Sequence, residues 1–282
     1  MSEKWREYYT EKQLADLQKI ELDLLCVFIQ VCNQLKLEYV IYGGTLLGLE
    51  KYGGMIPWDD DIDVALPRES YERFIREAEN VFPDGYILQT PFNCSSSPFP
   101  YAKLRKSGTR FVEYINRNLK IADGIYIDIY PIDKIPDNER LRKKQYKKVR
   151  KWILIYVFRQ SRLYDKKETS LAGKIKNVIK WVICHITRVF PQKYCARKID
   201  HYMTMYNGDS TRRYAALNSP NYDNVYENLY PLRQGKFNGI DVSIPGDYKA
   251  HLQKRYGDYS RELPEEERYG HTPYILETNI KS

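Results

Sequence analysis

Four aspartates within five positions constrain this chain more than any other feature of its sequence. Asp59, Asp60, Asp61 and Asp63 lie near the end of the segment YGGTLLGLEKYGGMIPWDDDIDVALP, residues 42–67. Like charges at this spacing repel one another, so a folded chain tolerates them mainly where a cation neutralises them. The alternative is a turn in which water solvates each carboxylate.

The residues around the aspartates predict a strand, a short helix and a second strand. EYVIY (38–42) reads as a short apolar strand, TLLGLEKY (45–52) as a helix, and DIDVAL (61–66) alternates apolar and acidic residues as a strand does. Glycines after the first strand let backbone come close to a ligand, and the following helix start directs free N–H groups at phosphate. We therefore expect three residues of this turn to bind substrate: Gly43, Gly44 and Thr45.

The second strand predicts a metal site. Asp61 and Asp63 would lie on one strand face, about 7 Å apart, where two carboxylates can hold a divalent cation. A third carboxylate from a neighbouring strand would complete an oxygen-rich site suited to Mg²⁺ or Mn²⁺. The candidate is Asp128, in the alternating strand GIYIDIYPIDKIP (124–136), with Asp133 as second choice. We predict that Asp61, Asp63 and Asp128 are metal ligands and catalytic residues.

The other two aspartates have different expected roles. Asp59 lies on the same strand face and is expected to hold a ligand or a water molecule beside the cation. Asp60 faces the other way and is expected to cap or pair. Flanking helices are predicted over residues 10–37, which open on a capping box, and 68–82.

Residues 42–67 resemble the signature of the LicD phosphotransferase family, to which the fukutin-type ribitol-phosphate transferases are related. The similarity continues through YAKLRKSGTRF, IYIDIYPIDKIP, FNGIDVSIPGDYKAHLQKRYGDY and the closing His271. Family members often carry Arg or His just before the second glycine pair, where this chain has Glu50-Lys51-Tyr52, and Lys51 is the candidate substitute. The metal-binding cysteine loop of the fukutin-type relatives is not seen.

The resemblance implies an α+β fold, with a nucleotidyltransferase-like mixed β-sheet and flanking helices. It also implies a metal-dependent phosphotransferase that moves a phospho-alcohol, with phosphocholine as first candidate, from a CDP-activated donor to a glycan hydroxyl. The acceptor would be a precursor of a cell-surface polysaccharide or teichoic acid, and CMP would be released. Two alternatives remain: a nucleotidyltransferase that adds NMP to a small molecule and releases pyrophosphate, and a binding module with an inactive site. Intact Asp61, Asp63 and Asp128 argue against the last.

The segment YAKLRKSGTRFVEY (101–114) predicts a hairpin with basic residues on both sides of its turn. Lys103 and Arg105, and less strongly Arg110, would clamp the donor phosphates and stabilise charge on the leaving CMP. The alternative is an ordinary set of exposed hairpin charges. His271 is a candidate substrate-binding residue through the resemblance alone.

The net charge of +8 is distributed very unevenly along the 282 residues. Residues 140–198 contain nineteen Lys and Arg against two acids, a local balance of +17 that leaves −9 for the rest. KIKNVIKWVICHITRVF (174–190) places its apolar residues on one helical stripe with basic residues largely elsewhere, which is typical of helices at anionic membranes. A helical hairpin packed on the body is the alternative, and the charge alone would also suit nucleic acid, which we do not expect as a partner.

These patterns predict three parts and a location. Residues 1–139 would form a nucleotidyltransferase-like catalytic core, 140–205 a basic amphipathic helical insert, and 206–282 the remainder of the catalytic domain. The five cysteines form no C-x-x-C pair, which indicates reduced thiols. MSEKWREYYTEK has no signal-peptide core, and no run of about 18 apolar residues occurs. We expect a cytoplasmic enzyme that is peripheral on the inner face of the plasma membrane. Its acceptor would be a glycan, either free or linked to a lipid.

Overall fold

The fold is built on a mixed β-sheet, seen in a computed structural model that describes residues 4–160, 170–217, 225–227, 229–268 and 270–278. The strands run in the order β1-β2-β6-β4-β3, and β7 and β8 extend the sheet beside β6. β2 and β6 are parallel, and the other pairs of this sheet are antiparallel. The predicted α+β class with a mixed sheet is confirmed. The strands are β1 (Val40–Ile41), β2 (Asp63–Pro67), β3 (Tyr86–Gln89), β4 (Ala102–Lys106), β6 (Tyr126–Lys134), β7 (Tyr214–Ala215) and β8 (Val225–Tyr226).

Alternation along β2 separates the core from the candidate site. Ile62, Val64 and Leu66 are fully buried in the main hydrophobic core. On the other face of the same strand, Ala65 belongs to a second apolar cluster, and Asp63 shares that face with it. The predicted strand therefore exists and has the predicted faces, although it begins at Asp63, so that Asp61 lies just before it.

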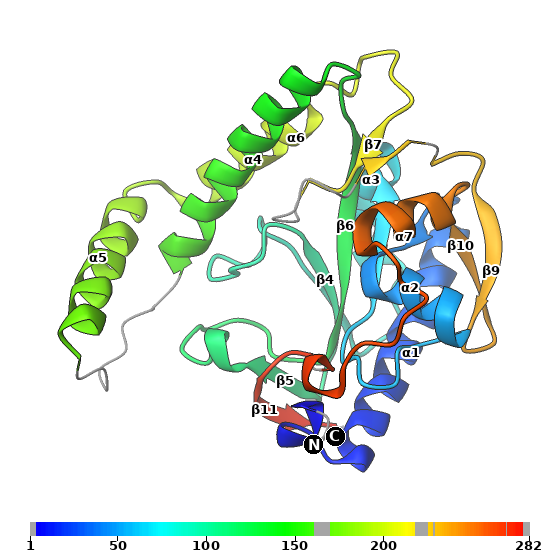
Figure 1. The fold of residues 1–282 in the computed structure, drawn as a ribbon, viewed down its shortest axis with the longest axis horizontal. Helices are drawn as coiled ribbons and strands as arrows, with labels where there is room; N and C mark the ends of the chain where they lie inside the picture. The colour runs from blue at the N-terminus through cyan, green and yellow to red at the C-terminus, as the bar shows by residue number, and fades with distance from the viewer. Residues whose placement is uncertain (1–3, 161–169, 218–224, 228, 269, 279–282) are drawn as a thin grey trace.

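Three helices flank these strands. α1 (Glu11–Gln34) begins at Thr10 with the predicted capping box and packs Leu17, Leu24 and Phe28 into the main core. α2 (Gly43–Tyr52) starts at the first glycine, so the predicted glycine turn is the first turn of the helix. α3 (Arg68–Glu77) follows β2 directly and continues into the short 3₁₀ helix η2 (Ala78–Asn80). In Figure 1, α1 and α2 lie together on one side of the long strand β6.

The C-terminal part of the chain returns to this framework. β9 (Arg233–Phe237) and β10 (Ile240–Ile244) form a hairpin, and α7 (Tyr248–Tyr256) follows. β11 (Pro273–Glu277) pairs with β5 (Arg110–Glu113), and η3 (Tyr114–Asn116) follows β5. η1 (Lys4–Glu7) and η4 (Glu265–Glu267) are in contact, and the Trp5 N–H donates to the Arg268 carbonyl at 2.9 Å.

The predicted hairpin over 101–114 is wrong. Both edges of β4 are occupied, one by β3 and the other by β6, so β4 has no free edge for β5. β5 instead pairs with β11, more than 150 residues further along the chain. The turn itself is present, because the Thr109 hydroxyl donates to the Lys106 carbonyl at 2.7 Å and accepts from the Ile125 N–H at 2.9 Å.

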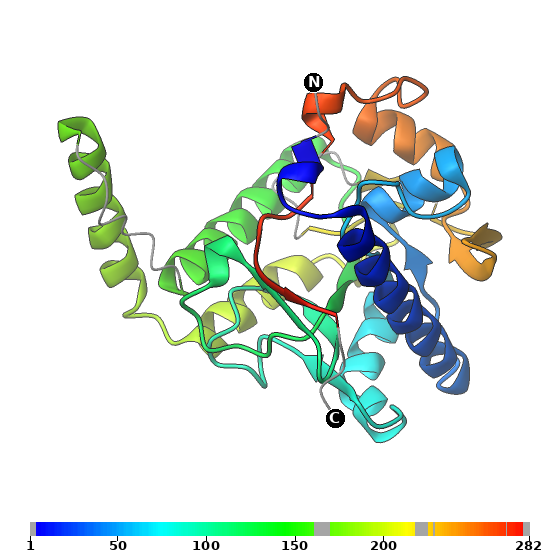
Figure 2. The same cartoon turned by 90° about the horizontal axis from the view of Figure 1, so that it is seen from below.

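Three helices occupy the basic region: α4 (Glu139–Gln160), α5 (Leu171–Thr187) and α6 (Gln192–Thr204). α4 and α6 share a small core that includes buried Val149, Tyr156, Cys195 and Ile199. α5 lies at the outer end of the molecule, beyond α4, in both Figure 1 and Figure 2. The boundaries 1–139, 140–205 and 206–282 stay a prediction.

Two further predictions concern cysteines and membrane spans. All five cysteines are free, as expected from their spacing. Among the described helices, none has both the length and the apolar composition that crossing a bilayer requires.

Candidate active site

The sheet register brings the predicted carboxylates to one place. Asp63, the first residue of β2, lies directly opposite Asp128 of β6. Asp61 precedes β2 by two residues, and one carboxylate oxygen from each of Asp59, Asp60 and Asp61 lies within 4.8 Å of the other two. The prediction that a neighbouring strand supplies a carboxylate opposite β2 agrees with this register.

Crowding and burial perturb these acids. Burial raises the pKa of Asp63 well above its ordinary value, and the charges of Asp61 and Asp128 raise it further. The pKa of Asp61 is raised to about 6, first by burial, while the charge of His271 opposes the shift. Asp59 is shifted in the same direction, first by burial and then by Asp61. Added positive charge would therefore favour the ionised form of each carboxylate.

The donor set fits a divalent cation. The Asp63 Oδ1 atom is buried and has no hydrogen-bond partner among the described residues. A buried carboxylate oxygen without a partner is costly, and a hard cation such as Mg²⁺ would satisfy it while neutralising its neighbours. Asp61, Asp63 and Asp128 are the residues that would hold the ion, and Asp59 is close enough to contribute. The metal and its identity stay a prediction.

The start of α2 is packed against these carboxylates. Gly43 has a φ of +59°, and a Cβ at this residue would lie 2.5 Å from Asp63 Oδ2. A Cβ on Gly44 would lie 3.1 Å from Asp59 Oδ2. The hydroxyl of Thr45 accepts from the Asp63 N–H at 2.8 Å. The two glycines therefore allow the start of α2 to approach the site's own carboxylates. Their predicted contact with substrate, and that of Thr45, stays a prediction.

Lys103 is the basic residue closest to the carboxylate pair. It is buried on β4, opposite Asp128 in the sheet, and its Nζ donates to Asp128 Oδ1 at 2.5 Å. The Tyr130 hydroxyl donates to the other oxygen of Asp128 at 3.1 Å. Burial lowers the pKa of Lys103, and the charge of Asp128 opposes that effect. The buried ammonium group of Lys103, beside Asp128, is suited to interact with a negatively charged substrate group that enters the site.

The other predicted basic residues are engaged elsewhere. Arg105 is buried, and it donates through Nε to Gln89 Oε1 at 2.5 Å and through Nη1 to the Gly124 carbonyl at 2.6 Å. Arg110 pairs with Asp123 at 2.7 Å. Lys51 donates to the Arg261 carbonyl at 2.7 Å. Their predicted contacts with phosphate stay predictions, and each would have to make them in addition to these bonds.

Asp133, the second choice for the third ligand, has a structural partner. Arg68 donates to both of its oxygens, through Nε at 2.7 Å and Nη2 at 2.6 Å. Asn207 donates to the same carboxylate at 2.7 Å. Three donors satisfy Asp133, which leaves Asp128 as the carboxylate of β6 that faces Asp63.

Asp60 is paired, as predicted. Its carboxylate is buried and accepts from the Tyr9 hydroxyl, from the His271 N–H at 2.7 Å and from His271 Nδ1 at 3.1 Å. Burial lowers the pKa of His271, but the Asp60 hydrogen bond and the charges of Asp61 and Asp60 outweigh it and raise the pKa to about 10. His271 therefore brings a positive charge to the acidic loop. Its predicted contact with substrate is not tested.

Sequence reasoning missed two charged residues at the site. Glu21 of α1 is buried, neither of its oxygens has a partner among the described residues, and its pKa is raised by burial and by Asp60. It falls on the apolar face of α1 between Leu17 and Leu24, and an acidic residue on an apolar helix face is the sequence pattern that could have identified it. Arg255 of α7 lies close enough to lower the pKa of Asp63. No local pattern singled it out within the segment 237–259.

A strand, a helix that starts against it and carboxylates on two adjacent parallel strands define a nucleotidyltransferase-type domain. Comparison with known proteins leads to the same class. Residues 36–174 match the family model described as LicD/FKTN/FKRP, nucleotidyltransferase domain. The chain is also 26% identical, over 93% of its own length and 98% of the relative's, to the lipopolysaccharide cholinephosphotransferase LicD of Haemophilus influenzae. Residues 36–174 therefore match a nucleotidyltransferase domain of the LicD family, as the motifs in this part of the chain predict.

Proposed function

We propose that the protein transfers phosphocholine from CDP-choline to a glycan hydroxyl in a Mg²⁺-dependent reaction that releases CMP. The observation that carries the proposal is the register that sets Asp63 opposite Asp128, beside Asp61 and the start of α2. Similarity to a lipopolysaccharide cholinephosphotransferase along nearly the whole chain supports the choice of substrate class. The acceptor would be a precursor of a cell-surface polysaccharide or teichoic acid, made in the cytoplasm.

The three carboxylates, the start of α2 and Lys103 have separate roles in this reaction. A bound Mg²⁺, held by Asp61, Asp63 and Asp128, would neutralise charge on the donor phosphates and polarise the phosphoryl group. The first turn of α2 has no side-chain cap, so its N–H groups are suited to face the diphosphate. Lys103 adds positive charge beside Asp128.

The covalent step needs one proton acceptor. The acceptor hydroxyl oxygen forms a bond to the phosphorus of phosphocholine, and the bond from that phosphorus to the CMP oxygen breaks. Asp128 is the carboxylate we assign to take the hydroxyl proton, because it is held in one orientation by Lys103 and Tyr130. His271 and Arg105 would stabilise substrate or leaving-group charge from outside this step.

Aromatic rings surround the Lys103 ammonium near Asp128. The Lys103 ammonium lies 3.4 Å from the ring centroid of Tyr126 and 4.0 Å from that of Phe99. Tyr101 and Tyr130 pack together beside them with centroids 4.5 Å apart. Lys103 already occupies these ring faces, so the choice of choline over ribitol and glycerol rests on the similarity to a cholinephosphotransferase.

The proposal is tested by product identity. The protein is incubated with Mg²⁺ and CDP-choline, CDP-ribitol or CDP-glycerol, with a glycan acceptor, and CMP is measured. A parallel reaction with CTP and phosphocholine is monitored for pyrophosphate, the product of the alternative nucleotidyltransferase. We expect CMP from CDP-choline, and a loss of about 10²-fold or more in Asp61→Asn. Asp84→Asn, an exposed aspartate outside the site, is the matched control. Pyrophosphate without CMP, or full activity of Asp61→Asn, would overturn the proposal.

A further inference from the structure

α5 exposes its apolar side chains and buries small and polar ones. Asn177, Cys184 and Thr187 are the buried side chains on its described surface, each at most 7% exposed. Six aliphatic residues along the helix and just beyond its end are instead between 40% and 78% exposed. A helix that packs on a protein body shows the reverse arrangement. The six residues, called here the α5 stripe, are Ile175, Val178, Ile179, Val182, Ile186 and Val189.

The α5 stripe points directly away from the rest of the protein. At about 100° per residue, the six side chains fall within a sector about 100° wide. The centre of this sector is about 180° from the buried side that carries Asn177 and Cys184. Because α5 also lies at the outer end of the molecule (Figures 1 and 2), no described element covers the stripe. It forms a continuous apolar surface on a projecting helix.

Basic residues border the α5 stripe on both sides. Lys176 lies on one flank and Lys174 on the other, each about 90–110° from the centre of the stripe, and both are exposed. Lys180 and Arg188 are also exposed but lie nearer the buried side of the helix. Trp181, 52% exposed, lies on the second flank. Long basic side chains beside an apolar stripe can reach a polar boundary while the stripe is buried, and tryptophan prefers such boundaries.

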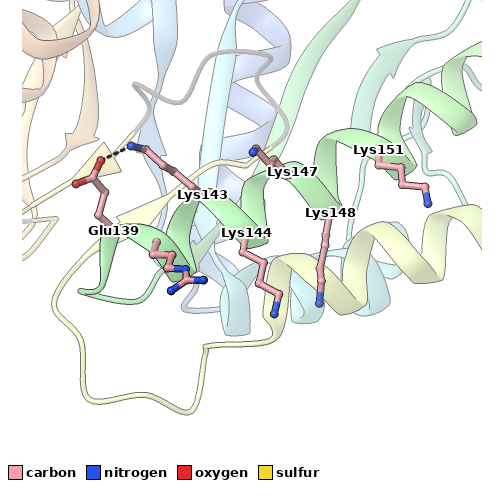
Figure 3. A pocket seen from close by; sticks show the side chains of 7 residues that line it. Glu139, Lys143, Lys144, Lys147, Lys148 and Lys151 are labelled. Carbon is pink, nitrogen blue, oxygen red and sulfur yellow. Dashed lines mark ion pairs between the residues drawn. The ribbon is translucent and has the colours of Figure 1, made fainter.

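The neighbouring helix α4 adds more positive charge. A shallow groove along its exposed surface is lined by one acid and six basic residues, turn after turn (Figure 3). None of these residues belongs to the carboxylate site, so the groove is a separate basic surface. The lining residues are Glu139, Arg140, Lys143, Lys144, Lys147, Lys148 and Lys151.

We propose that the α5 stripe inserts into the headgroup boundary of an anionic lipid bilayer, with the flanking basic residues on the lipid phosphates. Two features together select this occupant. The apolar stripe requires a partner with an apolar interior, which nucleic acid lacks, and the basic flanks require negative charge. A second copy of the chain would bring one basic region against another, whereas an anionic leaflet complements it. α5 lies in the plane of the membrane and does not cross it.

The experiment measures binding of the full-length protein to vesicles. Sedimentation is compared for neutral phosphatidylcholine vesicles and for vesicles that also contain phosphatidylglycerol, at about 0.05 M and about 0.5 M salt. We expect binding at least about 10-fold stronger to the anionic vesicles at low salt, and a large loss at high salt. Trp181 fluorescence should shift to the blue on binding, and Trp181→Phe should remove the part of the shift that this residue causes.

Two variants separate burial from charge. Ile179→Asn with Val182→Asn removes apolar surface from the stripe at constant charge and should abolish binding. Ile87→Asn with Ile115→Asn makes the same change at two exposed isoleucines away from α5 and should bind as the parent does. Lys174→Gln with Lys176→Gln, one basic residue from each flank, should weaken binding to anionic vesicles and reduce its salt dependence. Thermal melts of all variants should match the parent because every altered side chain is exposed.

Three results would overturn the proposal. The first is unchanged vesicle binding by the stripe variant, and the second is equal binding of the parent to neutral and anionic vesicles. The third is absence of binding together with self-association that the stripe variant abolishes, which would make a second copy the occupant. CMP release from a soluble donor is measured alongside, so a failure of membrane binding is distinguishable from a failure of the proposed reaction.

Discussion

The stability of the fold favours the neutral form of Asp63, whereas the proposed chemistry requires the ionised form. Its buried Oδ1 has no partner among the described residues, and neighbouring acids raise its pKa. Ionised and without a cation, this side chain destabilises the folded state. The proposed reaction nevertheless requires the ionised form, because only that form is a strong ligand for Mg²⁺.

Substitution of Asp63 should therefore separate stability from cation binding. We expect Asp63→Asn, without divalent cation, to be at least as stable as the parent. Mg²⁺ at 100 times its dissociation constant should stabilise the parent by about 2.7 kcal/mol and the variant by much less. Thermal melts with and without Mg²⁺ measure both effects, and Asp84→Asn should respond to Mg²⁺ as the parent does. An equal Mg²⁺ response in Asp63→Asn would argue against its role as a ligand.

Among the residues of the site, the sequence identifies those whose neighbours are determined by strand geometry. Alternation and a parallel register are enough to bring Asp63 and Asp128 together, so they were predictable. Glu21 and Arg255 reach the same site through the packing of α1 and α7 against the sheet. Such packing depends on contacts distant in sequence, and short patterns do not encode it.

At the scale of elements, the junction between β1 and α2 decides how closely the helix approaches the carboxylates. Gly43 adopts positive φ at the start of α2, and Gly53 does so just after its end. A Cβ on Gly43 would meet Asp63 Oδ2 at 2.5 Å, whereas a Cβ on Gly53 would meet nothing within 4 Å. Both glycines therefore adopt a positive φ, but only at Gly43 would an added Cβ contact a carboxylate of the site.

This pair gives a matched test of the helix position. Gly53→Ala should cost about 1–2 kcal/mol through the left-handed backbone alone and leave CMP release within about twofold of the parent. Gly43→Ala carries the same strain and also displaces Asp63, so stability should fall further and CMP release by about 10-fold or more. Denaturant unfolding and the CMP assay measure the two effects. Equal losses in both variants would mean that the approach of α2 to Asp63 is unimportant.

Elements were predictable where their signals are local. The capping box at Thr10 and the apolar face of α1 are both present, as predicted. The hairpin over 101–114 failed because Ser107 and Gly108 specify a turn but not the strands that pair around it. β5 has its partner in β11, and that choice depends on how the C-terminal part closes over the sheet.

At the scale of the whole molecule, buried ionisable groups act on acid stability in opposite directions. The raised pKa values of Asp61 and its neighbours mean that the folded state takes up protons more readily than the unfolded chain, which favours folding as pH falls through about 6. His251 of α7 acts the other way. Burial lowers its pKa to about 4, and the charge of Arg255 contributes to the shift.

The sign for His251 follows from where its proton binds. Between pH 6.5 and about 4 the unfolded chain holds a proton on this histidine and the folded protein does not. Its contribution to stability is therefore fully present above pH 6.5 and is lost as pH falls through about 4. A shift of this size corresponds to an upper limit of about 3 kcal/mol, at 1.36 kcal/mol per pKa unit.

Replacing His251 should make the protein less sensitive to acid. His251→Phe keeps a ring stacked on Tyr226, whose centroid lies 3.9 Å away, and loses a 3.5 Å contact with the Val225 carbonyl. We expect the variant to be within about 1 kcal/mol of the parent at pH 8. As pH falls from 6.5 to 4, the free energy of unfolding of the variant should rise relative to the parent by about 1–3 kcal/mol. Urea unfolding at each pH measures this difference, and the acidic cluster cancels because both proteins contain it. His251→Gln also lacks the titrating ring and should give the same pH dependence, even if it packs less well. A parent-minus-variant difference that stays constant over this range would show that His251 does not set the acid limit of the fold.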